Sequence, residues 1–149
     1  MRRLLAATLL TVTVVSAAPS PAHAIDPPAQ EPGVTLRTFD IGAPLSKVCE
    51  LKPGQTPNVD KLMPTIDWST ADDFGLETNF VTHALATLVT PVAGTYAFRL
   101  ISDDGAKLFL DDKLIIDHDG LHGADPKDGT ADLAAGTHAL RIEHFERDG

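Results

Sequence analysis

The sequence is poor in cysteine and in basic residues. Cys49 is the single cysteine among 149 residues, so no disulfide can form within the chain. We expect a buried thiol there, with pairing to a cysteine outside this sequence as the alternative. The 12 Lys and Arg stand against 21 Asp and Glu, giving a net charge of −9. Such a surface repels phosphate backbones and anionic lipids, so we expect no nucleic-acid partner.

The sequence also lacks the motifs of the common enzyme classes. It has no GxGxxG or GxxxxGK[ST] phosphate-binding loop, and no GxSxG, HExxH or CxxC motif. We therefore expect no catalytic residue in this chain, although a longer parent protein would be a separate question. The length and the apolar fraction of 43% fit one globular domain.

The N-terminus has the pattern of a secretory signal peptide. Arg2 and Arg3 precede an uncharged apolar run over residues 4–15, and residues 22–24 (AHA) fit a small-x-small cleavage site. We expect cleavage after Ala24 and a secreted, extracellular protein with no membrane attachment; an uncleaved anchor is the alternative. Residues 25–33 are Pro-rich and polar, and we expect an exposed lead-in there.

The remaining chain, residues 34–149, has the pattern of short strands separated by Gly and Asp turns. Tyr96, Phe98 and Leu100 alternate with more polar or smaller residues, which is the period of a half-buried strand. We expect strands at 34–39, 79–90, 95–102, 107–110, 113–117 and 137–146. The side chains expected to face the core from the later strands are Leu108, Leu110, Leu114, Ile116, Leu140 and Ile142. Residues 58–63 are expected to hold at most a short helical turn, and 117–130 a polar loop. The pattern predicts an all-β fold, an antiparallel β-sandwich or barrel.

Residues 94–145 carry a more specific signal. The marks are the Tyr96 and Phe98 alternation, the SDDG turn at residues 102–105, the LDD hairpin at 110–112, and the ending GTHALRIEHF. In order and spacing, this stretch resembles the protective-antigen-like domain, a fourteen-kilodalton module named after a bacterial toxin component. The resemblance implies an extracellular β-sandwich, usually appended to a glycosidase, another secreted enzyme, an adhesin or a toxin.

The resemblance also implies a binding site. In the sugar-binding branch of that family, two successive aspartates joined by a cis peptide bind calcium, and the calcium binds vicinal hydroxyls of a glycan. Asp103 and Asp104 match this pair. The family's third ligand is an Asn, which is missing from the C-terminal segment here. Glu146 is our candidate replacement and Asp148 a second, although Arg147 between them would oppose a cation.

Other interpretations of these residues stay open. The SDDG turn could be a plain turn, with its aspartates capping backbone N–H groups and Gly105 at positive φ. A zinc site could be formed by His118, His122 and Asp119, but histidines in Gly-rich loops more often act as hydrogen-bonded spacers. The remaining strand histidines, at 138 and 144, are expected at the rim of the sheet.

The sequence therefore predicts a non-catalytic, extracellular carbohydrate-binding or adhesion module. Its expected cofactor is Ca²⁺ at Asp103, Asp104 and Glu146, and its expected partner is a glycan or cell-wall polysaccharide. The alternative is a ligand-free accessory or spacer domain of a larger secreted enzyme, and a stand-alone enzyme comes third. The family continues with one more strand after this point, so we expect residues 34–149 to lack their last strand. Covalent linkage to further domains would then follow, with an exposed sheet edge as the alternative.

Overall fold

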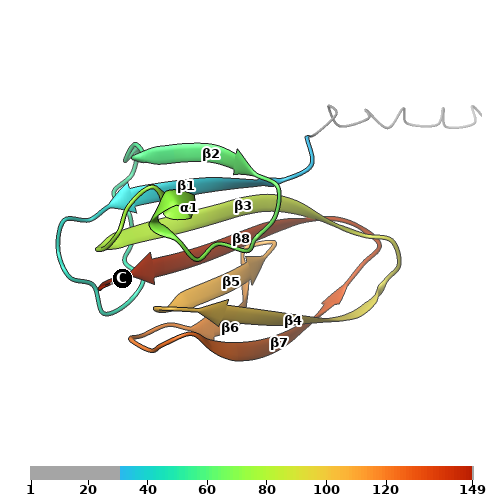
Figure 1. The fold of residues 1–149 in the computed structure, drawn as a ribbon. Helices are drawn as coiled ribbons and strands as arrows, with labels where there is room; N and C mark the ends of the chain where they lie inside the picture. Colours follow the sequence, from blue (N-terminus) through green and yellow to red (C-terminus); the bar gives the residue numbers. More distant parts are fainter. Residues whose placement is uncertain (1–30, 149) are drawn as a thin grey trace, which may run out of the picture. The chain divides into compact units, whose positions relative to one another are not determined.

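The computed structural model describes residues 31–148, and within them the chain is almost entirely β-structure (Figure 1). Its elements are β1 (Val34–Asp40), β2 (Val59–Met63), α1 (Ala71–Phe74), β3 (Phe80–Thr90), β4 (Gly94–Ser102), β5 (Ala106–Leu110), β6 (Lys113–His118), β7 (Asp125–Leu133) and β8 (Gly136–Glu146). The predicted signal peptide and most of the Pro-rich lead-in lie outside the described residues. Among residues 31–148, no helix has the length and apolar character needed to cross a membrane.

The strands form two antiparallel sheets. The larger has the order β2-β1-β3-β8-β5-β6, and the smaller pairs β4 with β7 (Figure 1). The longest pairing joins β3 and β8, from Phe80 opposite Glu146 to Thr90 opposite Gly136. Strands β5 and β8 also pair directly, which brings the start of β5 beside the end of β8.

One hydrophobic core joins the two sheets. Leu100 of β4 and Leu133 of β7 are buried in the same cluster as Leu108 of β5 and Ile142 of β8. Burying such side chains contributes about 1.5–3 kcal/mol each. The predicted all-β, antiparallel architecture is confirmed, and the shared core between two sheets is that of a sandwich.

The period-two pattern predicts most buried faces correctly. In β4, Leu100 is buried while Arg99 and Ile101 are exposed, and Leu108, Leu110 and Ile142 lie in the core. The expectation for Leu114 is wrong, because its side chain is 43% exposed. The pairing of β5 with β6 shifts register between Leu108 and Phe109, so the alternation does not run evenly along this hairpin.

Two segments predicted as non-strand are strands. Residues 59–63 form β2, an edge strand paired with β1, instead of a helical turn. The second half of the predicted 117–130 loop belongs to β7, which pairs with β4 along its whole length. β7 tolerates Pro126 because β4 is its one partner in the sheet. Its Gly129 lies so close to β6 that an added Cβ would be 2.8 Å from the Ile115 carbonyl oxygen.

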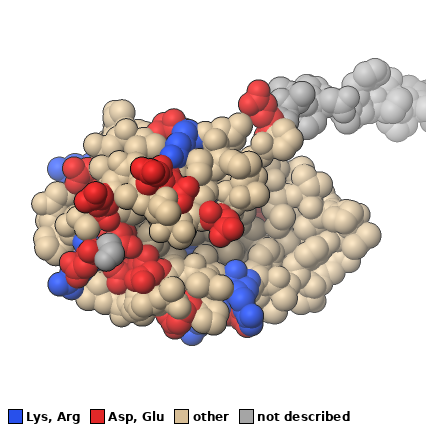
Figure 2. Space-filling view, in the orientation of Figure 1, with Lys and Arg blue, Asp and Glu red and all other residues tan. Residues whose placement is uncertain are grey.

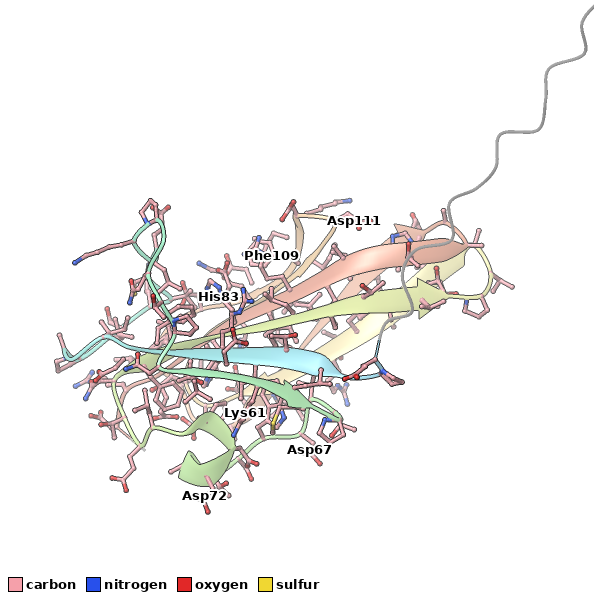
Figure 3. The ribbon with its side chains drawn as sticks, turned by 90° about the horizontal axis from the view of Figure 1, so that it is seen from above. Lys61, Asp67, Asp72, His83, Phe109 and Asp111 are labelled. Atoms are coloured by element: carbon pink, nitrogen blue, oxygen red, sulfur yellow. The ribbon has the colours of Figure 1, made fainter. Side chains whose placement is uncertain are left out.

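The short helix α1 packs beside the end of β8. Thr70 and Asp73 form a capping box at its start, which satisfies N–H groups of the first turn. The Lys61 ammonium of β2 donates to the Asp72 carbonyl oxygen of α1 at 3.1 Å, and Figure 3 shows both residues at the edge of the molecule where β2 and α1 lie. Phe74, the last residue of the helix, stacks on His144 of β8 with ring centroids 5.5 Å apart.

Candidate functional site

The turn between β4 and β5 carries Asp103 and Asp104, and three contacts fix it to the end of β8. The His144 Nε2 lies 2.9 Å from the Asp103 carbonyl oxygen. The backbone N–H of Phe145 donates to the Gly105 carbonyl oxygen at 3.0 Å, and the N–H of Arg147 donates to Asp104 Oδ2 at 3.1 Å. The peptide joining Asp103 to Asp104 is cis. The three contacts hold the turn against residues 144–147 at the end of β8.

His144 anchors the turn without adding a positive charge. Burial lowers its pKa below the usual value, outweighing the hydrogen bond to Asp103 and the nearby carboxylates, so the ring is neutral at neutral pH. A carbonyl oxygen only accepts, so Nε2 carries the proton of the neutral ring. Nδ1 then accepts from the Thr82 hydroxyl, 3.2 Å away. This expected rim residue is thus a partly buried support of the turn.

The structure brings Glu146 to the two aspartates. One carboxylate oxygen from each of Asp103, Asp104 and Glu146 lies within 4.8 Å of the others. Asp104 is 9% exposed, Glu146 is partly buried and Asp103 is exposed. In Figure 2, Asp and Glu side chains gather at the end of the domain where β8 finishes. The three residues proposed from the sequence therefore form one cluster, here called the carboxylate cluster.

The donor set of the carboxylate cluster suits calcium. Calcium takes six to eight oxygen ligands at about 2.3–2.6 Å, so two oxygens on one ion are separated by at most about 5 Å. The three carboxylate oxygens of the cluster lie within 4.8 Å of one another and so satisfy this condition. Two like charges about 4 Å apart repel by about 1 kcal/mol in water and about 4 kcal/mol near a protein surface, and a divalent cation would reverse that repulsion.

The side chain and the backbone of Arg147 contact two different carboxylates. Its Nε lies 3.1 Å from Asp148 Oδ2, so its guanidinium is next to the exposed Asp148 carboxylate. Its backbone N–H faces Asp104, as described above. Asp148 is consequently engaged with Arg147 and is absent from the carboxylate cluster, which leaves Glu146 as the third carboxylate.

Gly105 is required for a different reason from the one expected. It does not have a positive φ. A Cβ at this position would be 2.5 Å from the Gly120 nitrogen and 2.7 Å from Phe145 Cε1. The absence of a side chain therefore lets the β4–β5 turn pack directly against the loop that follows β6.

The structure does not show the less favoured zinc grouping of Asp119 with the two loop histidines. Asp119 Oδ2 lies 2.8 Å from the Lys107 ammonium, and its Oδ1 accepts from the Val48 N–H at 2.8 Å. The residue that joins His118 and His122 is Asp125, at the start of β7. The sequence pattern misses Asp125 because it predicts a continuous loop over 117–130.

Two further sequence candidates have ordinary structural surroundings. His138 pairs with Asp111, with 2.7 Å between Nδ1 and Oδ2, and the hydrogen bond to that carboxylate raises the pKa of His138. Cys49 is a free, half-buried thiol rather than a fully buried one.

Comparison with known proteins identifies relatives of the fold. A family model described as PA14 domain matches residues 30–149. No curated protein matches the sequence significantly. A PA14 sugar-binding domain from an RTX adhesin is 20% identical, with a TM-score of 0.67, and the match covers 80% of this chain and 85% of that one. The PA14 domain of the antifreeze protein MpAFP is 13% identical, with a TM-score of 0.69 over 85% of this chain and 82% of that one.

The chain is also similar to part of larger proteins. The β-glucosidase from Kluyveromyces marxianus, in complex with glucose, is 16% identical with a TM-score of 0.56; the match covers 75% of this chain and 14% of the enzyme. Across the larger solved proteins that it resembles, the chain spans 14% to 44% of their length. At these identities, the structural likeness shows the fold.

Proposed function

The chain belongs to the PA14 domain family, and from that premise we propose that it is a non-catalytic, secreted module that binds glycans through calcium. Asp103, Asp104 and Glu146 would hold the ion. The observation that carries this proposal is the carboxylate cluster, whose three oxygens lie within 4.8 Å of one another. Similarity to a PA14 sugar-binding domain from an adhesin supports the glycan part.

Each side chain of the cluster has a distinct role in this proposal. Asp104 is held by the Arg147 N–H, so one of its oxygens is fixed while the other can bind the ion. Asp103 is positioned through its carbonyl oxygen by His144, which leaves its exposed carboxylate to face solvent. Glu146 supplies the charge that the family's Asn does not, so the site carries three carboxylates.

The exposed side of the cluster is where a sugar would bind. Three carboxylates supply at most six oxygens, and Asp103 lies at the protein surface. Bound calcium would offer its remaining coordination positions to water or to a pair of vicinal sugar hydroxyls. The expected ligand is therefore a glycan or cell-wall polysaccharide with an accessible vicinal diol.

A ligand-free accessory role is the second candidate, and one observation favours it. The chain corresponds to only 14% of a β-glucosidase, so a domain of this kind also occurs within an enzyme. In that role the turn would serve packing through Gly105 and the carboxylate cluster would bind neither ion nor sugar. Linkage of this chain to further domains belongs to the same proposal.

A glycan array tests the proposal directly. The protein is applied with excess Ca²⁺ and, separately, with chelator, as wild type and as Asp103→Asn/Asp104→Asn. The matched control is Asp111→Asn/Asp112→Asn, the adjacent aspartate pair of the β5–β6 turn, which lies outside the carboxylate cluster. We expect calcium-dependent binding by wild type and control and none by the Asp103/Asp104 variant. Binding that persists in chelator or in that variant would contradict the mechanism, and absence of binding throughout would favour the accessory role.

A further inference from the structure

A second group of metal-ligating side chains lies on the loop that joins β6 to β7. His118 is the last residue of β6, His122 lies in the loop, and Asp125 begins β7. One ligand atom from each lies within 4.8 Å of the others. The two imidazoles are largely buried, with side chains 13% and 19% exposed, while Asp125 is 56% exposed. The loop thus places two shielded nitrogens beside one solvent-facing carboxylate.

The spacing of these atoms fits one small cation. Asp125 Oδ1 is 3.0 Å from His122 Nδ1 and 3.4 Å from His118 Nε2. Metal–ligand bonds of about 2.0–2.1 Å in a tetrahedral zinc site place neighbouring ligand atoms about 3.3 Å apart. Both nitrogen–oxygen distances are therefore close to an edge of such a tetrahedron. The two rings also stack, with centroids 4.0 Å apart, so the two imidazoles already lie side by side.

Backbone contacts set which nitrogen of His122 is available. His122 Nε2 lies 3.0 Å from the His118 carbonyl oxygen, to which the ring donates. In a metal-bound ring, this donor role of Nε2 leaves the Nδ1 lone pair for the ion, on the side that faces Asp125. Metal-binding histidines in proteins usually have their second nitrogen hydrogen-bonded in this way, which fixes the ring and its tautomer.

Without a metal, the same nitrogens have proton-mediated contacts. His122 Nδ1 is 3.0 Å from the Gly123 carbonyl oxygen, and His118 Nε2 is 3.2 Å from the Asp125 carbonyl oxygen. A metal ion bound to these nitrogens would take the place of the proton in such contacts.

We propose that His118, His122 and Asp125 form a binding site for a divalent transition-metal ion such as Zn²⁺. Two imidazoles and one carboxylate suit zinc, whereas calcium prefers oxygen ligands alone. The exposed side of Asp125 leaves the fourth position to water. The site is chemically distinct from the carboxylate cluster, which offers no nitrogen.

The two cation sites are neighbours in space. The segment from His118 to Asp125, here called the histidine loop, includes Gly120. Gly120 packs directly on Gly105 of the β4–β5 turn. The Asp104 carboxylate acts electrostatically on His122, and it would favour a cation there as well. The zinc proposal nevertheless stands on the histidine loop alone, so its test must separate the two sites.

Titration of the purified protein with Zn²⁺, and with Co²⁺ as a spectroscopic probe, tests this inference. We expect wild type to show a zinc-dependent rise in the thermal unfolding midpoint and the visible absorption of tetrahedral Co²⁺. His118→Ala/His122→Ala should lose both signals. Asp125→Asn, a milder change, should weaken zinc binding about tenfold or more.

Two control variants complete the test. His138→Ala removes a histidine that pairs with the Asp111 carboxylate and belongs to no metal-ligating group among residues 31–148, and it should leave zinc binding unchanged. Asp103→Asn/Asp104→Asn should also retain the Co²⁺ spectrum, whatever the outcome for calcium. Equal zinc responses in wild type and in both loop variants, or loss of the Co²⁺ spectrum with Asp103 and Asp104 alone, would overturn the assignment.

Discussion

Replacement of Gly105 by alanine should test how tightly the β4–β5 turn packs on the histidine loop. The added Cβ would be 2.5 Å from the Gly120 nitrogen, 2.7 Å from the Gly120 oxygen and 2.7 Å from Phe145 Cε1. Two of these are backbone atoms, and Phe145 is 0% exposed, so none can turn aside into solvent. The turn must therefore separate from either the loop or the end of β8.

The magnitude follows from this geometry. Inserting a methyl group into a packed site typically destabilises a protein by about 1–3 kcal/mol. Alanine also restricts the unfolded chain, which stabilises by about 0.4–1 kcal/mol wherever the folded backbone accepts it. Gly123→Ala is the matched control, because a Cβ there meets nothing within 4 Å and its φ is not positive. The difference between the two variants isolates the packing cost.

Urea unfolding and thermal unfolding of both variants provide the measurement. We expect Gly105→Ala to lose about 1–3 kcal/mol relative to Gly123→Ala, which for a domain of this size lowers the midpoint by about 4–12 °C. We also expect a smaller calcium response, because Asp103 and Asp104 move with the turn. A Gly105→Ala protein as stable as the control, within about 0.5 kcal/mol, would show that the close approach to Gly120 is not required.

Three further predictions concern stability and titration. Phe145→Ala should cost about 3–5 kcal/mol in the free energy of unfolding, because this large aromatic ring is fully buried; a loss under about 1 kcal/mol in urea unfolding would contradict this. Thr90→Val should cost about 1–3 kcal/mol, since the buried Thr90 hydroxyl donates to the Ala134 carbonyl oxygen at 2.6 Å, and the same assay should find a cost near zero if that bond is unimportant. NMR titration should give His138 a pKa above its usual 6.5, and Asp111→Asn should return it toward that value. Because the pKa of His138 is higher in the folded state, the His138–Asp111 pair stabilises the fold below the unfolded pKa, and that contribution is lost as the pH rises through the folded pKa. A His138 pKa equal to its usual value would contradict this prediction.

Much of the fold is readable from sequence because several strands have one apolar face. The alternation around Leu100 and Leu108 predicts their burial, since each strand's own pattern already distinguishes inside from outside. The sequence pattern does not predict β2 and β7. β7 is mostly exposed and contains Pro126 and Gly129, so it is a strand because β4 pairs with it and not because of local preference. Pairing between distant segments carries no signature within either segment.

The candidate sites divide in the same way. Asp103 and Asp104 are adjacent in sequence and match a family pattern, so the amino-acid sequence alone is enough to single out the pair. That Glu146 reaches them depends on β5 pairing with β8, which brings residues about 40 positions apart into one cluster. The proximity of Asp125 to His118 likewise depends on where β7 starts. The sequence offers Asp119 only as a less favoured third zinc ligand, and in the structure Lys107 and Val48 contact that carboxylate.

Thermal unfolding with excess Ca²⁺ and with chelator tests the central claim most directly. A ligand that binds only the folded state stabilises it by about 2.7 kcal/mol at a hundredfold excess over its dissociation constant. We predict a clear calcium-dependent rise in the midpoint of wild type, lost in Asp103→Asn/Asp104→Asn, reduced in Glu146→Gln and retained in Asp148→Asn, whose carboxylate lies beside Arg147 outside the cluster. A folded wild-type protein whose midpoint is the same in calcium and in chelator would contradict the account and leave SDDG as a packing turn.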